Sequence, residues 1–396
     1  MITSLQPKFT NYFVEQKESL INNLFITTEA VFMAKTPNLN KAKDYVGTIL
    51  NNQLTTTVDS NYTRLIRFFD EAALNHQELT RSLLLIVFCI LRPKKNKKPL
   101  YLILDGTSWE LGCTKVHLLT LSIVINEVAV PIIWEDLEKK GISNIEERKA
   151  LFESACEWYD LEGMLLLADR EYIGEEWFKY LKSKKIDFVI RLRKAIYKKC
   201  VDEQRSGVSN CFKHQKCTYS AMEHQAMMPM YKNTGVSKQV EILGELYSFV
   251  IFKNPKTEGV KKEDTLIYYL STLNNKAKII ALYPTRWKIE CCFKHLKTNG
   301  FNLEEVNLGT SVKIKMMMAI LVFLYAICID QGLKEFEKCS KKSAFKKYKN
   351  GKITLSRSVF RTGLAIVQGK FTNLQGFFTF LINLLHHART PVWVHV

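Results

Sequence analysis

Two short apolar runs, residues 100–104 and 164–168, constrain the fold of this 396-residue chain most strongly. Each run is too short for a buried helix and carries no charged residue, which is typical of a strand covered on both faces. The segments around them alternate in type: strands are expected at 116–126, 128–134 and 187–191, and helices at 146–159 and 174–184. This alternation predicts an α/β protein with a mixed sheet flanked by helices.

An aspartate follows each of the two apolar runs, Asp105 after the first and Asp169 after the second. Ligands of open α/β sheets gather at strand ends, so two carboxylates in these positions are candidates for one site. Aspartate is also common in the loops that follow strands, and the pair alone leaves a purely structural role open.

The N-terminal segment, residues 1–95, has apolar residues at three- and four-residue spacing and predicts a helical domain that ends in a basic linker. Ser60 is expected to cap a helix that carries Arg64 and Arg67 one turn apart. This helix either contacts DNA or is a surface helix with two solvated arginines.

The remaining chain divides into three predicted parts. A β-rich insertion spans 195–250, a catalytic core combines 96–194 with 251–333, and a basic helical region spans 334–396. The 14-residue apolar run 316–329 is too short to cross a bilayer and predicts a buried helix, so no membrane partner is expected. Five Cys and His residues between Cys200 and His224 lack a paired knuckle and are a weak zinc candidate.

The net charge is +18, and it is unevenly distributed. Residues 101–194 carry 13 basic and 17 acidic side chains, while both flanking segments are basic. A solvated basic surface would explain this pattern. A carboxylate metal site flanked by polyanion-binding lobes explains it as well. The ten cysteines and the absence of an apolar leader at the N-terminus favour a reducing cytoplasm.

A third polar element lies in the predicted helix over residues 275–297. At 100° per residue, Tyr283, Arg286, Glu290 and Lys297 fall within a stripe of roughly 60°. One carboxylate among two cations and a phenol is suited to binding phosphate and metal. An exposed helix with an Arg286–Glu290 ion pair is the alternative.

The spacing of these four residues resembles the Tyr-Arg-Glu-Lys signature of a branch of bacterial insertion-sequence transposases of the DDE class. Residues 104–107 and 167–174 resemble the two aspartate motifs of that family, and the resemblance covers about residues 60–365. It implies an RNase H-like core and a cut-and-paste transposase.

The resemblance also implies roles for individual residues. Asp105, Asp169 and Glu290 would form the metal-binding triad for two Mg²⁺ ions, with Mn²⁺ as a substitute. Tyr283, Arg286 and Lys297 would hold the DNA strand beside the scissile phosphate. Trp287 is expected to pack against the sheet or to stack on a base. Further expected DNA contacts are Lys294, Arg191, Arg193, Arg64 and Arg67.

The predicted function is a transposase that binds terminal inverted repeats of double-stranded DNA as a homodimer, cleaves the DNA and transfers 3′-hydroxyl ends into a target. The expected location is the bacterial cytoplasm, on the nucleoid. A non-transposing nuclease and a catalytically silent DNA-binding protein are the alternatives. Relatives that cut through a DNA hairpin can hold a flipped base with an aromatic residue of the insertion. No Trp lies between Trp177 and Trp287 of this chain, so the sequence does not decide for a hairpin route; candidate substitutes are Tyr197, Tyr219, Tyr231 and Tyr247.

Overall fold

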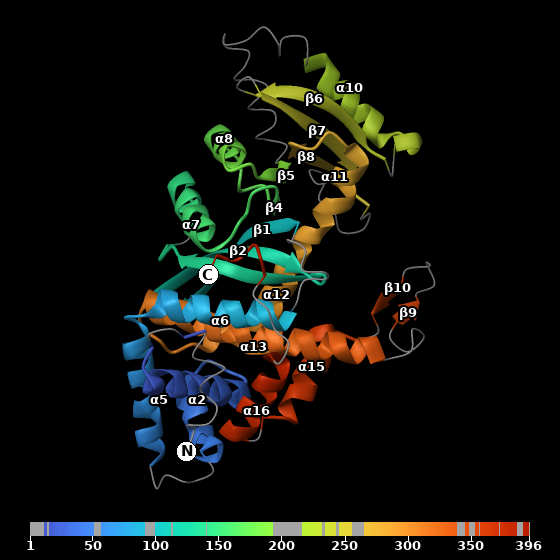
Figure 1. Cartoon of the computed structure of the whole chain (residues 1–396). Helices are drawn as coiled ribbons and strands as arrows, with labels where there is room; N and C mark the ends of the chain where they lie inside the picture. Colours follow the sequence, from blue (N-terminus) through green and yellow to red (C-terminus); the bar gives the residue numbers. More distant parts are fainter. Residues whose placement is uncertain are drawn as a thin grey trace.

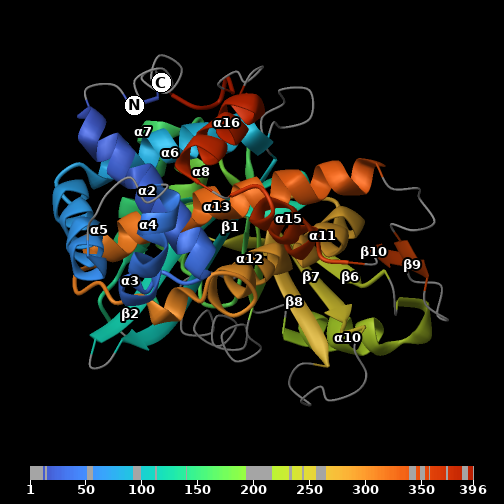
Figure 2. The ribbon, with the colours of Figure 1, turned by 90° about the horizontal axis from the view of Figure 1, so that it is seen from below.

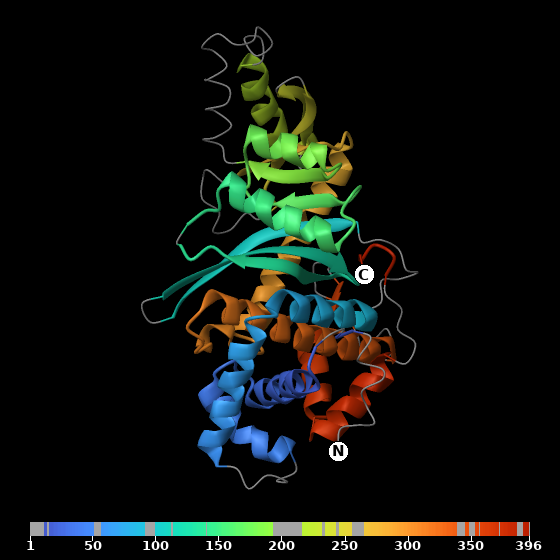
Figure 3. The ribbon, with the colours of Figure 1, turned by 60° about the vertical axis from the view of Figure 1, so that its left-hand side comes forward.

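The protein is elongated, with a mixed sheet between two groups of helices (Figures 1 and 3). The structure, a computed structural model, describes residues 12–13, 16–50, 57–91, 100–111, 114–139, 141–192, 216–231, 234–242, 245–255, 265–338, 345–347, 353–355, 357–371, 373–385 and 391–395. The predicted linker and most of the Cys and His residues of the zinc candidate lie outside the described residues.

The sheet has eight strands in the order β3-β2-β1-β4-β5-β8-β7-β6. Strands β1, β4 and β5 are parallel, and the other neighbours are antiparallel. The strands are β1 (Tyr101–Leu111), β2 (Thr114–Ile125), β3 (Val128–Asp136), β4 (Leu165–Ala168), β5 (Asp187–Leu192), β6 (Val236–Ile242), β7 (Glu245–Lys253) and β8 (Leu266–Ser271). The prediction of a mixed α/β sheet is confirmed.

Strand β6 and most of β7 come from the predicted insertion and extend the main sheet through β8 of the predicted core, which pairs with β5. The helix α10 (Lys216–Met227) lies with these strands at one end of the molecule (Figures 1 and 2). The expected boundary at residue 250 falls inside β7, so it divides a strand. The division into domains stays a prediction.

Helices cover both faces of the sheet (Figure 3). On one face lie α7 (Ile145–Trp158), which begins with a capping box between Asn144 and Glu147, and α8 (Glu175–Ser183). On the other lie α6 (His76–Leu91), α12 (Trp287–Lys297) and α13 (Ser311–Lys338). The helices predicted at 146–159 and 174–184 are therefore confirmed.

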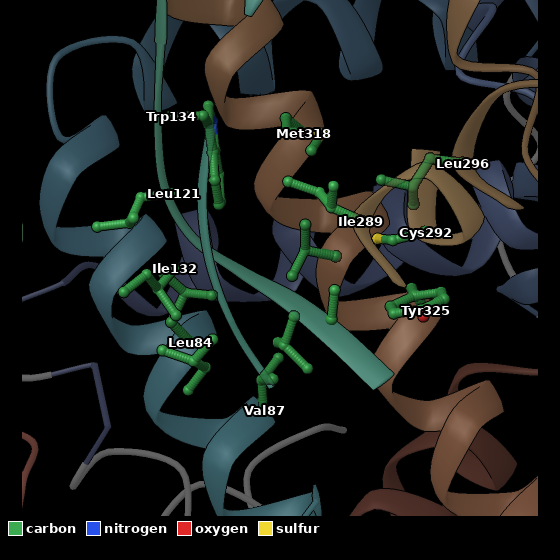
Figure 4. Close-up of a cluster of buried hydrophobic side chains, with 14 of the residues drawn as sticks. Leu84, Val87, Leu121, Ile132, Trp134, Ile289, Cys292, Leu296, Met318 and Tyr325 are labelled. Carbon is green, nitrogen blue, oxygen red and sulfur yellow. The ribbon is translucent and has the colours of Figure 1, made fainter. Parts of the chain in front are cut away.

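The helix α12 is held against the sheet by its apolar side (Figure 4). Its buried residues Ile289, Cys292 and Leu296 lie in one cluster with side chains of β2, β3, α6 and α13, including Trp134 and Tyr325. A helix fixed in this way holds its neighbouring polar side chains at a defined position beside the sheet.

The long helix α13 is the centre of the helical half. It is apolar around its whole circumference, and 83% of its most apolar window is buried. By length and composition alone, α13 is the one described helix that could cross a membrane. The sharply bent pair α5 (Val58–Ala72) and α6 meets the same criterion only if the two helices are counted as one span. Burial among other helices is what its all-round apolar sequence predicts, so the expected buried helix at 316–329 is confirmed.

The N-terminal and C-terminal helices pack together around α13 (Figure 2). The N-terminal elements are α2 (Glu18–Ala34), α3 (Leu39–Ala42), α4 (Val46–Ile49) and α5 (Val58–Ala72). The C-terminal elements are β9 (Phe345–Lys347), β10 (Ile353–Leu355), α15 (Val359–Gln368) and α16 (Leu374–Leu385). The expected cap at Ser60 is wrong, because α5 begins earlier and Thr57 accepts the capping hydrogen bond from the Ser60 amide.

Candidate active site

The register of two parallel strands brings the two aspartates side by side. Leu104 of β1 is the partner of Ala168, the last residue of β4, so Asp105 and Asp169 are the next residues on adjacent strands. The expectation that the first strand stops at Asp105 is wrong. Strand β1 continues to Leu111, because its antiparallel partner β2 extends beyond the end of β4. Asp105 therefore sits inside a strand, where its backbone is fixed on one side.

The third polar element begins with a turn. Helix α11 (Lys276–Leu282) ends before Pro284, residues Tyr283–Arg286 form a 3₁₀ turn, and α12 starts at Trp287. The single continuous helix that the sequence suggested is thus interrupted, in keeping with the proline. Arg286 and Glu290 lie on either side of the junction and still face the sheet.

The structure brings five of the predicted residues together. The Arg286 guanidinium donates from Nη1 to Oδ2 of Asp105 at 3.1 Å and from Nη2 to Oε1 of Glu290. The Tyr283 hydroxyl donates to Oδ1 of Asp169 at 3.4 Å. Three carboxylates, one guanidinium and one phenol thus form one polar cluster over the end of β4 and the middle of β1, which we call the carboxylate cluster.

Burial controls the ionisation of this cluster. Only 17% of the Asp105 side chain is exposed. This burial raises its pKa to about 7, although Arg286 and the Gly106 amide both lower it. Burial also raises the pKa of Tyr283, which keeps the phenol protonated as a donor. Burial lowers the pKa of Arg286, but Tyr283 and the carboxylates outweigh this and raise it above its ordinary value.

A glycine and a histidine next to Asp105 were not singled out from the sequence. A β-carbon on Gly106 would lie 2.8 Å from Nε2 of His117, so the imidazole occupies the space that any larger residue would need. His117 is fixed by a 2.6 Å hydrogen bond between Nδ1 and the Ser108 hydroxyl. The glycine directly after Asp105 was the only sequence signal, and it is informative only once β1 is known to continue past Asp105, because a glycine within a strand marks close approach of another group.

Lys297 lies on the same helix but is already engaged with the protein. Its ammonium donates to the Ser108 carbonyl at 2.9 Å, pairs with Glu304 at 2.9 Å and lies 5.3 Å from the centre of the Trp109 ring. Trp109 is buried. Lys297 thus ties α12 to β1 close to the carboxylate cluster.

The other predicted contacts are placed as follows. Trp287 is 59% exposed, so the expectation that it packs against the sheet is wrong. Lys294 is exposed on α12. Arg191 lies in β5 opposite Tyr269, whose ring contacts Tyr283. Arg193 and Tyr197 lie outside the described residues. The other predicted residues lie away from the cluster: Arg64 and Arg67 are on α5, Tyr219 is on α10, Tyr231 is in a short turn and Tyr247 is buried.

The donor set suits a hard divalent cation, since carboxylate oxygens are the ligands that Mg²⁺ and Mn²⁺ prefer. Within the described part of the chain, no three His, Cys, Asp or Glu side chains are arranged closely enough to hold a metal ion. The reason is visible in the cluster, where the positive charge between Asp105 and Glu290 is the Arg286 guanidinium. The residues fit a metal in their chemistry, and Arg286 neutralises them in this arrangement.

A comparison with protein families places the carboxylate cluster within a known domain. The family model described as "Transposase DDE domain" matches residues 96–327, which include all three carboxylates. The chain therefore belongs to the DDE transposase family. Among solved structures, the chain is similar to the cryo-EM structure of the piggyBac transposase synaptic complex with hairpin DNA, at 11% identity and a TM-score of 0.43 over 98% of this chain and 81% of that chain. No curated protein matches.

Proposed function

We propose that this member of the DDE transposase family is an active transposase of the bacterial insertion-sequence branch with the Tyr-Arg-Glu-Lys signature. It would bind the terminal inverted repeats of its element, cleave the DNA by phosphodiester hydrolysis and join the 3′-hydroxyl ends to a target. The observation that carries the proposal is the convergence of Asp105, Asp169 and Glu290 within the matched domain, where Arg286 contacts Asp105 and Glu290 and Tyr283 contacts Asp169.

Asp105, Asp169 and Glu290 would hold Mg²⁺, or Mn²⁺ in its place, as two ions per site. Bound there, the metal would supply activation of the attacking oxygen and stabilisation of the leaving oxygen of an in-line displacement. Asp105 must first lose its proton, because only the ionised carboxylate is a ligand. Its raised pKa, about 7, makes this step sensitive to pH near neutrality.

Arg286 has two tasks in this proposal. Without metal, its guanidinium pairs with Asp105 and Glu290 and keeps these partly buried carboxylates together. Once their charge is otherwise neutralised, the fork of the guanidinium is available for a phosphate oxygen of the DNA strand. Tyr283 orients Asp169 through its hydroxyl, and Lys297 holds β1 to α12 and adds positive charge beside the site.

The rest of the molecule is assigned by the same proposal. The mixed sheet with helices on both faces supports an RNase H-like core, interrupted by the β-rich insertion. The N-terminal helices would bind the transposon end, and two copies would act together as a homodimer on the DNA. The proposed location is the bacterial cytoplasm, on the nucleoid.

Two alternatives share the fold. A non-transposing nuclease would cleave without joining ends, and a silent DNA-binding protein would do neither. The test incubates the protein with Mg²⁺ and DNA that carries the ends of its own element, and then resolves nicked, hairpin and joined products. Joined products support the proposal, nicks alone support the nuclease, and intact DNA supports the silent protein.

Variants of the carboxylates connect this assay to the site. Asp105→Asn, Asp169→Asn and Glu290→Gln should each abolish cleavage and leave DNA binding largely intact. Asp187→Asn and Glu175→Gln are matched controls, because these carboxylates are exposed and lie at the start of β5 and α8. Full cleavage by any of the three site variants would remove that residue from the triad.

A further inference from the structure

A buried tyrosine beside the carboxylate cluster takes no part in the proposed mechanism. Tyr172 lies in the turn between β4 and α8, three residues after Asp169, and it is completely buried. Its amide donates a hydrogen bond to the Asp169 carbonyl at 3.0 Å, which closes the turn. The backbone of Tyr172 is therefore fixed relative to one of the two aspartates of the cluster.

The ring of Tyr172 is held by α7. The Arg148 guanidinium lies 5.2 Å from the centre of the ring, which is a cation–π contact. Arg148 is itself buried, and it donates from Nε to the Ser143 hydroxyl at 2.9 Å and from Nη2 to the Glu171 carbonyl at 3.2 Å. The phenol thus has one defined position, and only its hydroxyl proton is free to turn.

The hydroxyl of this ring lies next to the other aspartate. A β-carbon on Gly106 would lie 3.8 Å from the Tyr172 hydroxyl oxygen, so the phenol reaches β1 at the residue that follows Asp105. The Gly106 amide donates to Oδ1 of Asp105 at 2.9 Å, which turns that carboxylate toward the same residue. Tyr172 thus connects the backbone of one aspartate with the surroundings of the other.

This hydroxyl is an unpaired donor. Within the described part of the chain, no group forms a hydrogen bond with it. Burial raises the pKa of Tyr172 well above its ordinary value, and the charges of Asp105 and Glu171 raise it further, so the phenol keeps its proton. A buried hydroxyl without a partner destabilises a fold, and phenylalanine would fill the same space without this cost. The hydroxyl is therefore expected to have an acceptor in a second state of the site.

The hydrogen bonds of the two aspartates indicate what that state is. Tyr283 donates to Oδ1 of Asp169 at 3.4 Å, whereas Oδ2 of Asp105 accepts from Arg286 at 3.1 Å. Under the proposed function Arg286 moves to a phosphate oxygen, and Asp105 then loses a donor. Carboxylates that ligate a metal are themselves held by hydrogen bonds, which fix their orientation. Tyr172 is a neighbouring donor that is still unused.

We propose that Tyr172 is a positioning residue: its hydroxyl donates to the Asp105 carboxylate when Arg286 leaves, and it orients this carboxylate for the divalent metal. The inference rests on the proposed function, which supplies the state in which Arg286 leaves. Each aspartate of the cluster then has a phenol of its own. Glu171 is the competing acceptor, and the experiment separates the two.

The variant that tests the inference is Tyr172→Phe, which keeps the ring and removes only the hydroxyl. The matched control is Tyr159→Phe. Tyr159 is also buried, but its hydroxyl already donates to the Ile132 carbonyl at 3.3 Å, where the end of α7 meets β3. The full chain is used throughout. The quantities compared are the thermal unfolding temperature without metal, the Kd for Mn²⁺ by calorimetry, and the rate of Mg²⁺-dependent cleavage of the element ends.

The two variants should show opposite patterns. Tyr172→Phe should leave the unfolding temperature unchanged or raise it, because no hydrogen bond is lost in the metal-free fold. It should weaken Mn²⁺ binding and slow cleavage by about 10–100-fold, the usual effect of removing a hydrogen bond to a metal ligand. Tyr159→Phe should lower the unfolding temperature and leave Mn²⁺ binding and cleavage as in the native chain.

A spectroscopic measurement identifies the acceptor. Tyrosine is labelled with ¹³C at Cζ, and the Tyr172 resonance is assigned by its absence from Tyr172→Phe. Saturating Mg²⁺ should shift this resonance in the native chain and also in Glu171→Gln, because the acceptor is Asp105. The Tyr159 resonance should stay in place.

Native Mn²⁺ affinity in Tyr172→Phe would overturn the inference, and so would a lower unfolding temperature, which would mean that the hydroxyl already has a partner. A Mg²⁺-induced shift that is lost in Glu171→Gln would overturn it as well, because the acceptor would then be Glu171. The proposed function stands in these cases as long as the native chain binds Mn²⁺ and cleaves. A native chain that does neither refutes the proposed function and the inference together.

Discussion

Divalent metal binding to the carboxylate cluster should strengthen about tenfold between pH 6 and pH 8. Burial raises the pKa of Asp105 to about 7. Its ionised fraction then rises from about one tenth at pH 6 to about nine tenths at pH 8, and only the ionised form is a ligand. The apparent Kd should fall by the same factor, which corresponds to about 1.4 kcal/mol. An ordinary aspartate is ionised at both pH values and would give no change.

The assay is calorimetric titration with Mn²⁺ or Mg²⁺ at pH 6, 7 and 8. Other groups near the site contribute little, because burial lowers the pKa of His117 and lowers that of His295 to about 4. Glu29 is the matched control. Its side chain is buried in α2 and burial raises its pKa to about 8, so Glu29→Gln removes a second carboxyl that titrates in this range.

The pH effect should persist in Glu29→Gln, and metal binding should be lost in Asp105→Asn. The folding stability of the metal-free protein should show the opposite trend and decrease as the pH rises. A carboxyl whose pKa is higher in the folded than in the unfolded state costs stability as pH rises from about 4 to 7, here by at most about 4 kcal/mol. Metal affinity that is constant from pH 6 to 8, or unchanged in Asp105→Asn, would refute this reasoning.

Three further predictions concern packing and ionisation. Gly363→Ala should destabilise the fold by at least about 3 kcal/mol, because its β-carbon would lie 1.7 Å from the Cys328 carbonyl oxygen. In the control Gly309→Ala, the β-carbon meets open space, and the thermal unfolding temperature should stay nearly unchanged. Gly106→Ala should cost about 1–3 kcal/mol and be partly rescued by His117→Ala in a double-mutant cycle; additive losses would contradict the contact. The stability of the native chain should fall between pH 5 and pH 9 as Glu29 ionises, and Glu29→Gln should reduce this fall by at most about 5 kcal/mol. An equal fall in the native chain and the variant, measured by chemical denaturation, would contradict the raised pKa of Glu29.

Much of the sheet could be predicted from the sequence, because its buried strands are short apolar runs between turn residues. Residues 164–168 and 187–191 have this character and form β4 and β5. The extension of β1 beyond Asp105 could not be predicted in this way. Residues 105–108 have low strand propensity, and their strand conformation depends on hydrogen bonding to β2, which is a tertiary effect.

The candidate site, like the sheet, could be predicted from the sequence only in its local features. The projection of residues 283–297 at 100° per residue correctly placed Arg286 and Glu290 on one face, since the two side chains form an ion pair across a single turn. It did not show that Arg286 also reaches Asp105, because that contact joins elements 181 residues apart. The exposure of Trp287 was within reach of the sequence, because this residue lies beside the polar stripe and away from Ile289 and Cys292, which are buried.

The central claim, that Asp105, Asp169 and Glu290 hold divalent metal, is tested most directly by anomalous diffraction from crystals of the DNA complex grown with Mn²⁺. The account predicts Mn²⁺ density at these three carboxylates, with Arg286 released from both Asp105 and Glu290. Density for a pair of ions roughly 3.5–4 Å apart would match a two-metal site. Well-ordered Mn²⁺ elsewhere, with Arg286 still bound to both carboxylates, would contradict the account.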